Sequence, residues 1–176
     1  NNGFCEYASV KYSMPEWIVE YISSRYGEKR AENIFEGFLS ADKGISVRCN
    51  ISKNTPDEIF MMLESQGIQV RKSELFGYAF NIDGFDKITD IDAFNNGYIQ
   101  VQDQSSILAG HVYSVKGDEN IIDICAAPGG KTLHAADRLN AAEKSGIGNI
   151  ISCDLTEQKV KLISDNIKRN GFRNIS

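Results

Sequence analysis

The residues from Asp123 to Thr132 read DICAAPGGKT, and their types and spacing are the first sign of chemistry in the sequence. An apolar run precedes them and a helical pattern follows, so we expect a strand that enters a helix through a glycine-containing turn. Such a turn presents backbone N–H groups and a helix N-terminus at the carboxyl end of a parallel sheet, where α/β folds bind ligands. We therefore expect an anionic or dipolar ligand at this loop.

Three ligands compete for a loop of this kind: a nucleoside triphosphate, a dinucleotide and S-adenosylmethionine. Gly130, Lys131 and Thr132 match the end of the phosphate-binding G-x-x-x-x-G-K-[ST] motif, but this motif requires glycine where the sequence has Cys125. The dinucleotide motif G-x-G-x-x-G is not matched either, because the two glycines of the loop are adjacent. S-adenosylmethionine remains.

Asp154 ends a second buried apolar run, NIISCD, further along the chain. In a doubly wound sheet this position lies beside the first loop, where a carboxylate can accept hydrogen bonds from both hydroxyls of a ribose. The residue thus indicates an adenosine-containing ligand. The alternative is that Asp154 only caps the helix that starts at Thr156.

The stretches around the loop predict the first half of a doubly wound parallel sheet. Two short apolar runs, typical of buried parallel strands, are each followed by a helical pattern. The expected elements are a strand in 98–103, a helix in 105–115, a strand in 120–125, a helix in 131–140, a strand in 149–154 and a helix between Thr156 and Gly171. The sequence ends at NIS, where a third strand would begin.

Residues 1–97 predict a separate, small helical and α+β module, so we place a domain boundary between 97 and 98. The expected elements are a helix in 13–27 capped by Ser13, a helix in 28–40, a strand in 45–53, a helix that starts at Asn54 or Thr55 and ends at Gly67, and strands in 69–75 and 78–82. Trp17, Tyr21, Phe35 and Phe38 recur at helical spacing. They are expected in the core rather than on an RNA-stacking surface.

Composition and charge exclude several classes of protein. The net charge is −5, and residues 1–97 carry 10 basic and 15 acidic side chains against 9 and 9 in residues 98–176, so a nucleic-acid role must rest on motifs. The four cysteines form no C-x-x-C pair and only His111 and His134 accompany them, so neither a zinc site nor a disulfide framework is expected. No apolar run is long enough to span a membrane and no secretory signal is present, so a cytoplasmic location is expected.

The loop and its flanks resemble the RsmB/NOP2/Sun family of RNA cytosine-5 methyltransferases. The segments that carry the resemblance are GYIQVQDQSS, DICAAPGGKT and NIISCDLTEQKVKLISDNIKRNGF. Upstream, KYSMPEWIVEYISSRYG and ISVRCNISKNTPDEI resemble the segments before the catalytic domain in the bacterial 16S ribosomal RNA branch. The sequence departs from the family pattern at Met14, where histidine is more frequent, and at Lys159, where arginine is usual.

The resemblance implies an α/β fold, the first half of a Rossmann-like S-adenosylmethionine-dependent methyltransferase, with 16S ribosomal RNA as the partner. It implies a loop around the methionine part of the cofactor, made of Cys125, Ala126, Ala127, Pro128, Gly129, Gly130 and Lys131, and places the ribose at Asp154. Glycines and alanines let the backbone approach closely, and the helix N-terminus can face the methionine carboxylate. Lys131 faces either that carboxylate or an RNA phosphate, or it is a solvated helix lysine.

The same resemblance places the catalytic nucleophile and a second cysteine beyond residue 176. Methylation at cytosine C5 requires a thiolate that adds at C6, so the chain by itself is expected to be an inactive fragment of the enzyme. Cys125 and Cys153 are expected to be small hydrophobes at the ends of buried strands.

The stretch 121–125 would expose an apolar strand edge, which favours oligomerisation. Two other functions stay open: a nonenzymatic RNA-binding or assembly module, and a fragment that binds a nucleoside triphosphate through Gly130, Lys131 and Thr132.

Overall fold

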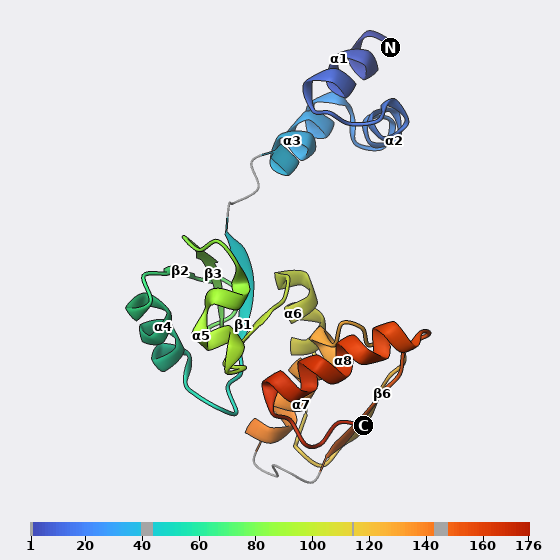
Figure 1. The fold of residues 1–176 in the computed structure, drawn as a ribbon. Helices are drawn as coiled ribbons and strands as arrows, with labels where there is room; N and C mark the ends of the chain where they lie inside the picture. The colour runs from blue at the N-terminus through green and yellow to red at the C-terminus, as the bar shows by residue number, and fades with distance from the viewer. Residues whose placement is uncertain (1, 40–43, 114, 143–147) are drawn as a thin grey trace. The chain divides into compact units, whose positions relative to one another are not determined.

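The computed structural model describes residues 2–39, 44–113, 115–142 and 148–176 (Figure 1). By their internal contacts the residues form two compact units, Asn1–Lys43 and Gly44–Ser176, and each is described by itself. The boundary expected between residues 97 and 98 lies inside the second unit. The reason is that a strand beyond residue 97 pairs with the sheet made by the residues before it.

Three helices make up the first unit: α1 (Asn2–Lys11), α2 (Glu16–Tyr26) and α3 (Glu28–Leu39). The two helices expected here, α2 and α3, are confirmed, whereas the apolar pattern of α1 is too weak to predict it. A small apolar core holds the unit together and consists of Ala8, Tyr12, Val19, Ala31 and Phe35.

Two expectations for this unit are wrong. Ser13 does not cap α2, and no side chain among the described residues caps that helix. Of the four aromatic residues expected in the core, only Phe35 is buried, whereas Trp17 is 69% exposed and Tyr21 and Phe38 are also exposed. A unit of this size has too little interior to bury four large rings.

An antiparallel four-stranded sheet with the strand order β2-β3-β1-β4 opens the second unit. The elements are β1 (Ile45–Cys49), α4 (Pro56–Ser65), β2 (Gln69–Lys72), β3 (Ala79–Asp83), a short 3-10 helix η1 (Ile88–Asp90), α5 (Asp92–Asn95) and β4 (Ile99–Val101). Residues 44–101 are called the four-stranded module below. β1 and β2 are shorter than the stretches 45–53 and 69–75 that alternation predicted.

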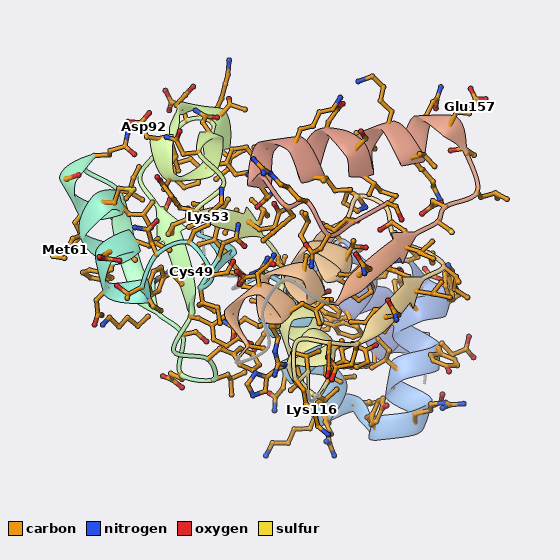
Figure 2. The ribbon with its side chains drawn as sticks, turned by 90° about the horizontal axis from the view of Figure 1, so that it is seen from below. Cys49, Lys53, Met61, Asp92, Lys116 and Glu157 are labelled. Carbon is orange, nitrogen blue, oxygen red and sulfur yellow. The ribbon has the colours of Figure 1, made fainter. Side chains whose placement is uncertain are left out.

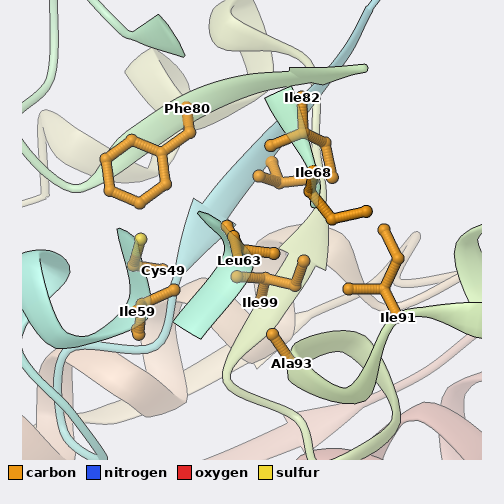
Figure 3. Packing of buried hydrophobic residues seen from close by; sticks show 10 residues of the cluster. Cys49, Ile59, Leu63, Ile68, Phe80, Ile82, Ile91, Ala93 and Ile99 are labelled. Atoms are coloured by element: carbon orange, nitrogen blue, oxygen red, sulfur yellow. The ribbon is translucent and has the colours of Figure 1, made fainter. Parts of the chain in front are cut away.

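Helix α4 covers one face of this sheet. Of the two predicted starts, Asn54 and Thr55, the helix uses Thr55: its side chain accepts the N–H of Glu58, while the Glu58 carboxylate accepts the N–H of Thr55. Figure 3 shows Ile59 and Leu63 packed against the apolar face, on which Phe80 lies. Alternate side chains of each strand point to this core, so the residues between them face the opposite side.

Two parallel strands, β5 (Asn120–Asp123) and β6 (Asn149–Ser152), form the second sheet. The helices of this part are α6 (Gln104–His111), α7 (Gly130–Ala141) and α8 (Glu157–Asn170). Ile175 forms an isolated parallel bridge with Ile150, at the place where the sequence predicted the start of a third strand. The order β5, α7, β6, α8 confirms the expected opening of a doubly wound sheet.

A buried ion pair joins the four-stranded module to α7. Arg48 of β1 and Asp137 of α7 are both almost completely inaccessible, and their Nη1 and Oδ2 atoms are 2.9 Å apart. Asp137 also accepts the N–H groups of Ile51 and Ser52, while Gln102 accepts from Nε of Arg48. Hydrogen bonds on both charges offset the cost of taking them out of water. The two sheets of the second unit are thereby held together through α7.

The carboxyl end of α8 contacts the same module. Asn50 donates from its side chain to Oδ1 of Asn170 at 2.6 Å and also to the carbonyl of Gly97. Gly97 has φ +67°, and a Cβ placed there would lie 2.7 Å from the Cα of Asn170 and closer still to the carbonyl oxygen of Arg169. Only glycine fits such an approach of two backbones.

Candidate cofactor-binding site

The predicted loop Cys125–Lys131 joins the end of β5 to α7. Ala126 N–H donates to the carbonyl of Cys153 beyond β6 (3.1 Å), and Gly129 N–H donates to the carbonyl of Ala126 (2.6 Å). The peptide bond between Ala127 and Pro128 is cis. Gly129 has φ +108°, a left-handed conformation that side-chain-bearing residues rarely adopt. The local hydrogen bonds thus fold the loop into a tight turn against the neighbouring strand.

Helix α7 begins at Gly130, and no side chain among the described residues caps its first turn. The first N–H groups of a helix have no partner inside the helix, and this end carries a partial positive charge. Lys131 is exposed in the same turn. The start of α7 can therefore offer backbone donors and an ammonium group to an anionic ligand.

Asp154 follows β6 and lies beside the loop. Its Oδ2 accepts the N–H of Ala127 at 2.9 Å, and its Oδ1 accepts the N–H of Leu155 at 2.7 Å and lies 3.1 Å from Nζ of Lys159. Chiefly because of the bond from Ala127, the pKa of this carboxyl is held below its usual value. The alternative role as helix cap is wrong, since Thr156 caps α8 through its own side chain.

Asp123 and Thr132 flank the loop and contact each other, although the sequence analysis assigned neither to the cofactor. The Thr132 hydroxyl donates to Oδ2 of Asp123 at 2.7 Å, and the N–H of Cys125 donates to Oδ1 at 3.2 Å. The end of β5 is thereby tied to the loop and to the first turn of α7. A carboxylate as the last residue of an apolar strand, nine residues before a threonine, was the available signal.

The expectation that Cys125 and Cys153 are buried is wrong, because both are exposed. Strands β5 and β6 end at Asp123 and Ser152, so each cysteine lies just beyond the sheet. Free thiols at these places are accessible to solvent.

One face of the two-stranded sheet is uncovered. Ile121 and Ile150 pack with α7 in a buried cluster, whereas Ile122 is 64%, Ile124 81% and Ile151 49% exposed. Within the described residues, β5 pairs with β6 alone. The predicted exposed apolar stretch 121–125 is therefore present, and a hollow beside it is lined in part by Lys131 and Thr132.

His111 lies in α6 and His134 in α7, and both contact Tyr78 of the four-stranded module. The hydroxyl of Tyr78 is 2.9 Å from Nδ1 of His111 and 3.4 Å from Nε2 of His134. Burial lowers the pKa of His134 to about 3, so its imidazole is neutral at ordinary pH. The histidine adds to the contact between α7 and the module.

No three His, Cys, Asp or Glu side chains in 2–39, 44–113, 115–142 and 148–176 gather as metal ligands do. No helix in these ranges has the length and apolar character needed to cross a bilayer.

Two family models match this chain. Residues 111–176 match the model of the 16S rRNA methyltransferases RsmB/F, and residues 14–89 match the ferredoxin-like domain of RsmF/B-like methyltransferases. Both models describe the RsmB/F methyltransferase family. The ferredoxin-like match includes β1, α4, β2 and β3 of the four-stranded module.

Curated relatives of the family match most of the chain. It is 35% identical over 165 residues to the probable ribosomal RNA small subunit methyltransferase B of Bacillus subtilis, a match that covers 93% of this chain and 35% of that protein. It is 28% identical over 159 residues to ribosomal RNA small subunit methyltransferase B of Proteus mirabilis, with 90% of this chain and 36% of that protein covered. The chain thus spans about 35% of the length of these relatives.

Solved structures share the fold. The crystal structure of PH0851 superposes with a TM-score of 0.87 at 31% identity and covers 98% of this chain and 38% of that one. A methyltransferase homologue from Pyrococcus horikoshii gives 0.81 at 23% identity and covers all of this chain and 55% of that one. These likenesses confirm the expected Rossmann-like methyltransferase fold class.

Proposed function

We propose that this chain is the cofactor-binding part of an S-adenosylmethionine-dependent methyltransferase that modifies ribosomal RNA. The hydrogen bond from the N–H of Ala127 to the carboxylate of Asp154 carries the proposal, because it joins the loop after β5 to the acidic residue after β6. More finely, we propose cytosine C5 of 16S ribosomal RNA as the methylated atom. A ribosomal RNA substrate also supports a cytoplasmic location.

The residues around the loop fit S-adenosylmethionine, which would supply an electrophilic methyl group. Gly129 and Gly130 leave the backbone accessible, and the first N–H groups of α7 can hold the methionine carboxylate. Lys131 is placed to neutralise the same carboxylate or an RNA phosphate. Asp154 is assigned to the ribose: a carboxylate has about four lone-pair sites, so hydroxyls can be bound beside its protein donors.

The proposal assigns binding to these residues and the covalent step to others. The two exposed thiols near the loop, Cys125 and Cys153, have no hydrogen bond to a basic side chain that the structure records. We propose that neither is the nucleophile, and that the chain alone binds the cofactor without methylating RNA. A pair of cysteines outside residues 1–176 would complete the reaction, as the family resemblance implies.

Calorimetric titration tests the assignment. S-adenosylhomocysteine and ATP are titrated separately into the wild-type chain and into Asp154→Ala, with Asp165→Ala on the exposed side of α8 as a matched control. We expect S-adenosylhomocysteine to bind the wild type and the control, and to bind Asp154→Ala at least tenfold more weakly, because a ribose partner that is charged is lost. Binding of ATP alone would support a nucleoside triphosphate site, and binding of neither ligand would favour a nonenzymatic RNA-binding module.

We also propose that the uncovered face around β5 mediates self-association of this chain. Ile122, Ile124 and Ile151 form an exposed apolar patch beside an unpaired strand edge. An edge of this kind pairs readily with a second copy of itself.

A further inference from the structure

Helix α8 contacts the cofactor loop and the four-stranded module with side chains only one turn apart. Figure 2 shows the helix running from Glu157 toward the part of the module around Lys53. Near its carboxyl end, Asn166 donates from Nδ2 to the carbonyl of Pro128 in the loop, at 2.9 Å. Oδ1 of the same side chain accepts from Nη2 of Arg169 at 3.1 Å.

Arg169 carries the connection into the module. Its Nη1 donates to the carbonyl of Phe94 at 2.7 Å, its Nη2 also donates to Oε1 of Gln100, and its guanidinium lies 3.9 Å from the centre of the Phe94 ring. Burial lowers the pKa of Arg169 to about 10, so the group stays charged at neutral pH. Its planar fork can hold several acceptors in one fixed arrangement.

Asn166 can link the loop to Arg169 because its side chain is a carboxamide. A carboxamide has donors on its nitrogen and an acceptor oxygen, so one side chain can bind a carbonyl on one side and a guanidinium on the other. Aspartate would keep the acceptor for Arg169 but would place an oxygen against the carbonyl of Pro128. Residues three apart on a helix lie on the same face, which brings Asn166 and Arg169 together.

We propose that Asn166 and Arg169 are positioning residues that couple the four-stranded module to the cofactor loop. The module holds Arg169, Arg169 orients the carboxamide of Asn166, and the carboxamide fixes the carbonyl of Pro128. A displacement of the module then loosens the loop and weakens its hold on the cofactor. The effect on cofactor affinity rests on the proposed function, whereas the effect on the loop does not.

Amide hydrogen exchange of the unliganded chain is the primary test. The N–H groups of Ala126, Ala127 and Gly129 are hydrogen-bonded, so their exchange reports loop opening. In Asn166→Asp we expect this exchange to be about three- to tenfold faster, as the loss of one hydrogen bond allows. Exchange that is unchanged in the loop, or that rises equally throughout α8 and β6, would overturn the proposal.

The matched control is Asn95→Asp, which makes the same chemical change elsewhere. Asn95 donates from its side chain to the carbonyl of Thr89 at 2.8 Å in an exposed part of the module. This variant loses a comparable hydrogen bond and gains the same charge. We expect no change of exchange in the loop, and a change equal to that of Asn166→Asp would count against the proposal.

A double-mutant cycle separates coupling from simple loss of structure. Arg169→Lys is expected to speed exchange in the loop when Asn166 is present, and to add nothing in an Asn166→Ala background. If Arg169 acted only by stabilising the end of α8, its replacement would loosen the loop equally in both backgrounds, and the coupling would be refuted.

Titration with S-adenosylhomocysteine gives the functional readout. We expect about three- to tenfold weaker binding to Asn166→Asp and wild-type affinity for Asn95→Asp. Absence of binding to the wild type would reject the proposed function, while the exchange data would still decide the positioning role. If Asn166→Asp bound S-adenosylhomocysteine as tightly as the wild type does, the coupling to the cofactor would be rejected and the proposed function would stand.

Discussion

Asp154 is held in its ionised form by every contact that it makes. The backbone N–H of Ala127 is the chief cause of its lowered pKa, followed by the N–H of Leu155. A lowered pKa in the folded state stabilises that state above the ordinary aspartate pKa, and this stabilisation is lost as the pH falls through the folded value. We expect the Ala127 amide resonance to titrate with a midpoint below 3.8, the ordinary value for aspartate.

Asp154→Asn provides the comparison for this titration. An amide oxygen can still accept from Ala127 but does not ionise over this range. The acid-induced shift of the Ala127 resonance should therefore vanish in the variant. A midpoint at or above 3.8 in the wild type would contradict the contact described for the carboxylate.

Asp137 is a buried carboxylate whose replacement is expected to reduce stability strongly. Replacement by alanine leaves the Arg48 charge buried without its partner and removes the acceptor of the Ile51 and Ser52 N–H groups. Breaking a buried pair in this way costs about 3–5 kcal/mol. Denaturant unfolding should show this loss for Asp137→Ala, against less than about 1 kcal/mol for Asp165→Ala on the surface.

A double replacement shows whether the loss comes from the unpaired charge. Arg48→Met combined with Asp137→Leu removes both charges and keeps apolar volume. Its free energy of unfolding should lie above that of Asp137→Ala. A double variant as unstable as the single one would mean that the hydrogen bonds, rather than the charge pair, hold α7 to the module.

At the scale of single residues, the sequence could predict the cofactor loop but not the buried ion pair between Arg48 and Asp137. Gly129 stands where the backbone takes a positive φ, and Asp154 follows the second parallel strand, beside the loop. Arg48 alternates with apolar residues in a strand, a pattern typical of a solvent-facing side chain. Its burial against Asp137 depends on how α7 packs on the sheet, and no local pattern reports that contact.

Among the elements, the loop before β4 and the end of α8 approach each other closely at Gly97. Gly97→Ala would push a methyl group into the backbone of Arg169 and Asn170 at a positive φ. We expect a loss of more than about 2 kcal/mol in the free energy of unfolding, since strain and displaced backbone add. Denaturant unfolding measures it directly.

Gly67→Ala is the matched control for this replacement. Gly67 has φ +79°, close to that of Gly97, but a Cβ there would meet no atom within 4 Å. Only the cost of the backbone conformation remains, about 1 kcal/mol. Equal losses in the two variants would show that the approach of Gly97 to α8 adds nothing.

Sequence signals predicted the ends of some elements better than others. The cap at Thr55, the cap at Thr156 and the stop at Gly171 delimit α4 and α8 correctly, because each is a local interaction. Strand ends were overestimated: alternation continues to residue 53, but β1 ends at Cys49, where Asn50 turns to bind Gly97 and Asn170. A tertiary contact ends this strand, so local periodicity missed it.

At the scale of the whole molecule, self-association is the property most open to measurement. Because the exposed apolar face around β5 is proposed to mediate self-association, analytical ultracentrifugation of the wild-type chain should show a concentration-dependent dimer. Ile122→Lys should shift the equilibrium to monomer, because it places a charge on the exposed patch. Leu162→Lys, on the exposed surface of α8, is the control and should leave the equilibrium unchanged.

Many of the expected elements are present, and the contacts join those of residues 44–176 in one unit. The parallel half-sheet and the α+β elements could be predicted because each has its own periodicity. These parts are joined in a single unit through Arg48, Gln102 and Asn50. All three are buried, although polar residues of these types are usually found at the surface. The boundary expected after residue 97 stays a prediction about folding units, and the contacts divide the chain after Lys43.

Arg48, Gln100 and Gln102 are buried, which limits the surfaces of the four-stranded module that a polynucleotide can contact. Small sheets of this kind often receive unstacked bases on the open side of the sheet, across its central strands. Here α6 and α7 already occupy that side, because Ile107 packs with Ala79 in one buried cluster and Asp137 binds Arg48. The central strands are therefore closed to unstacked bases on the side where α6 and α7 lie.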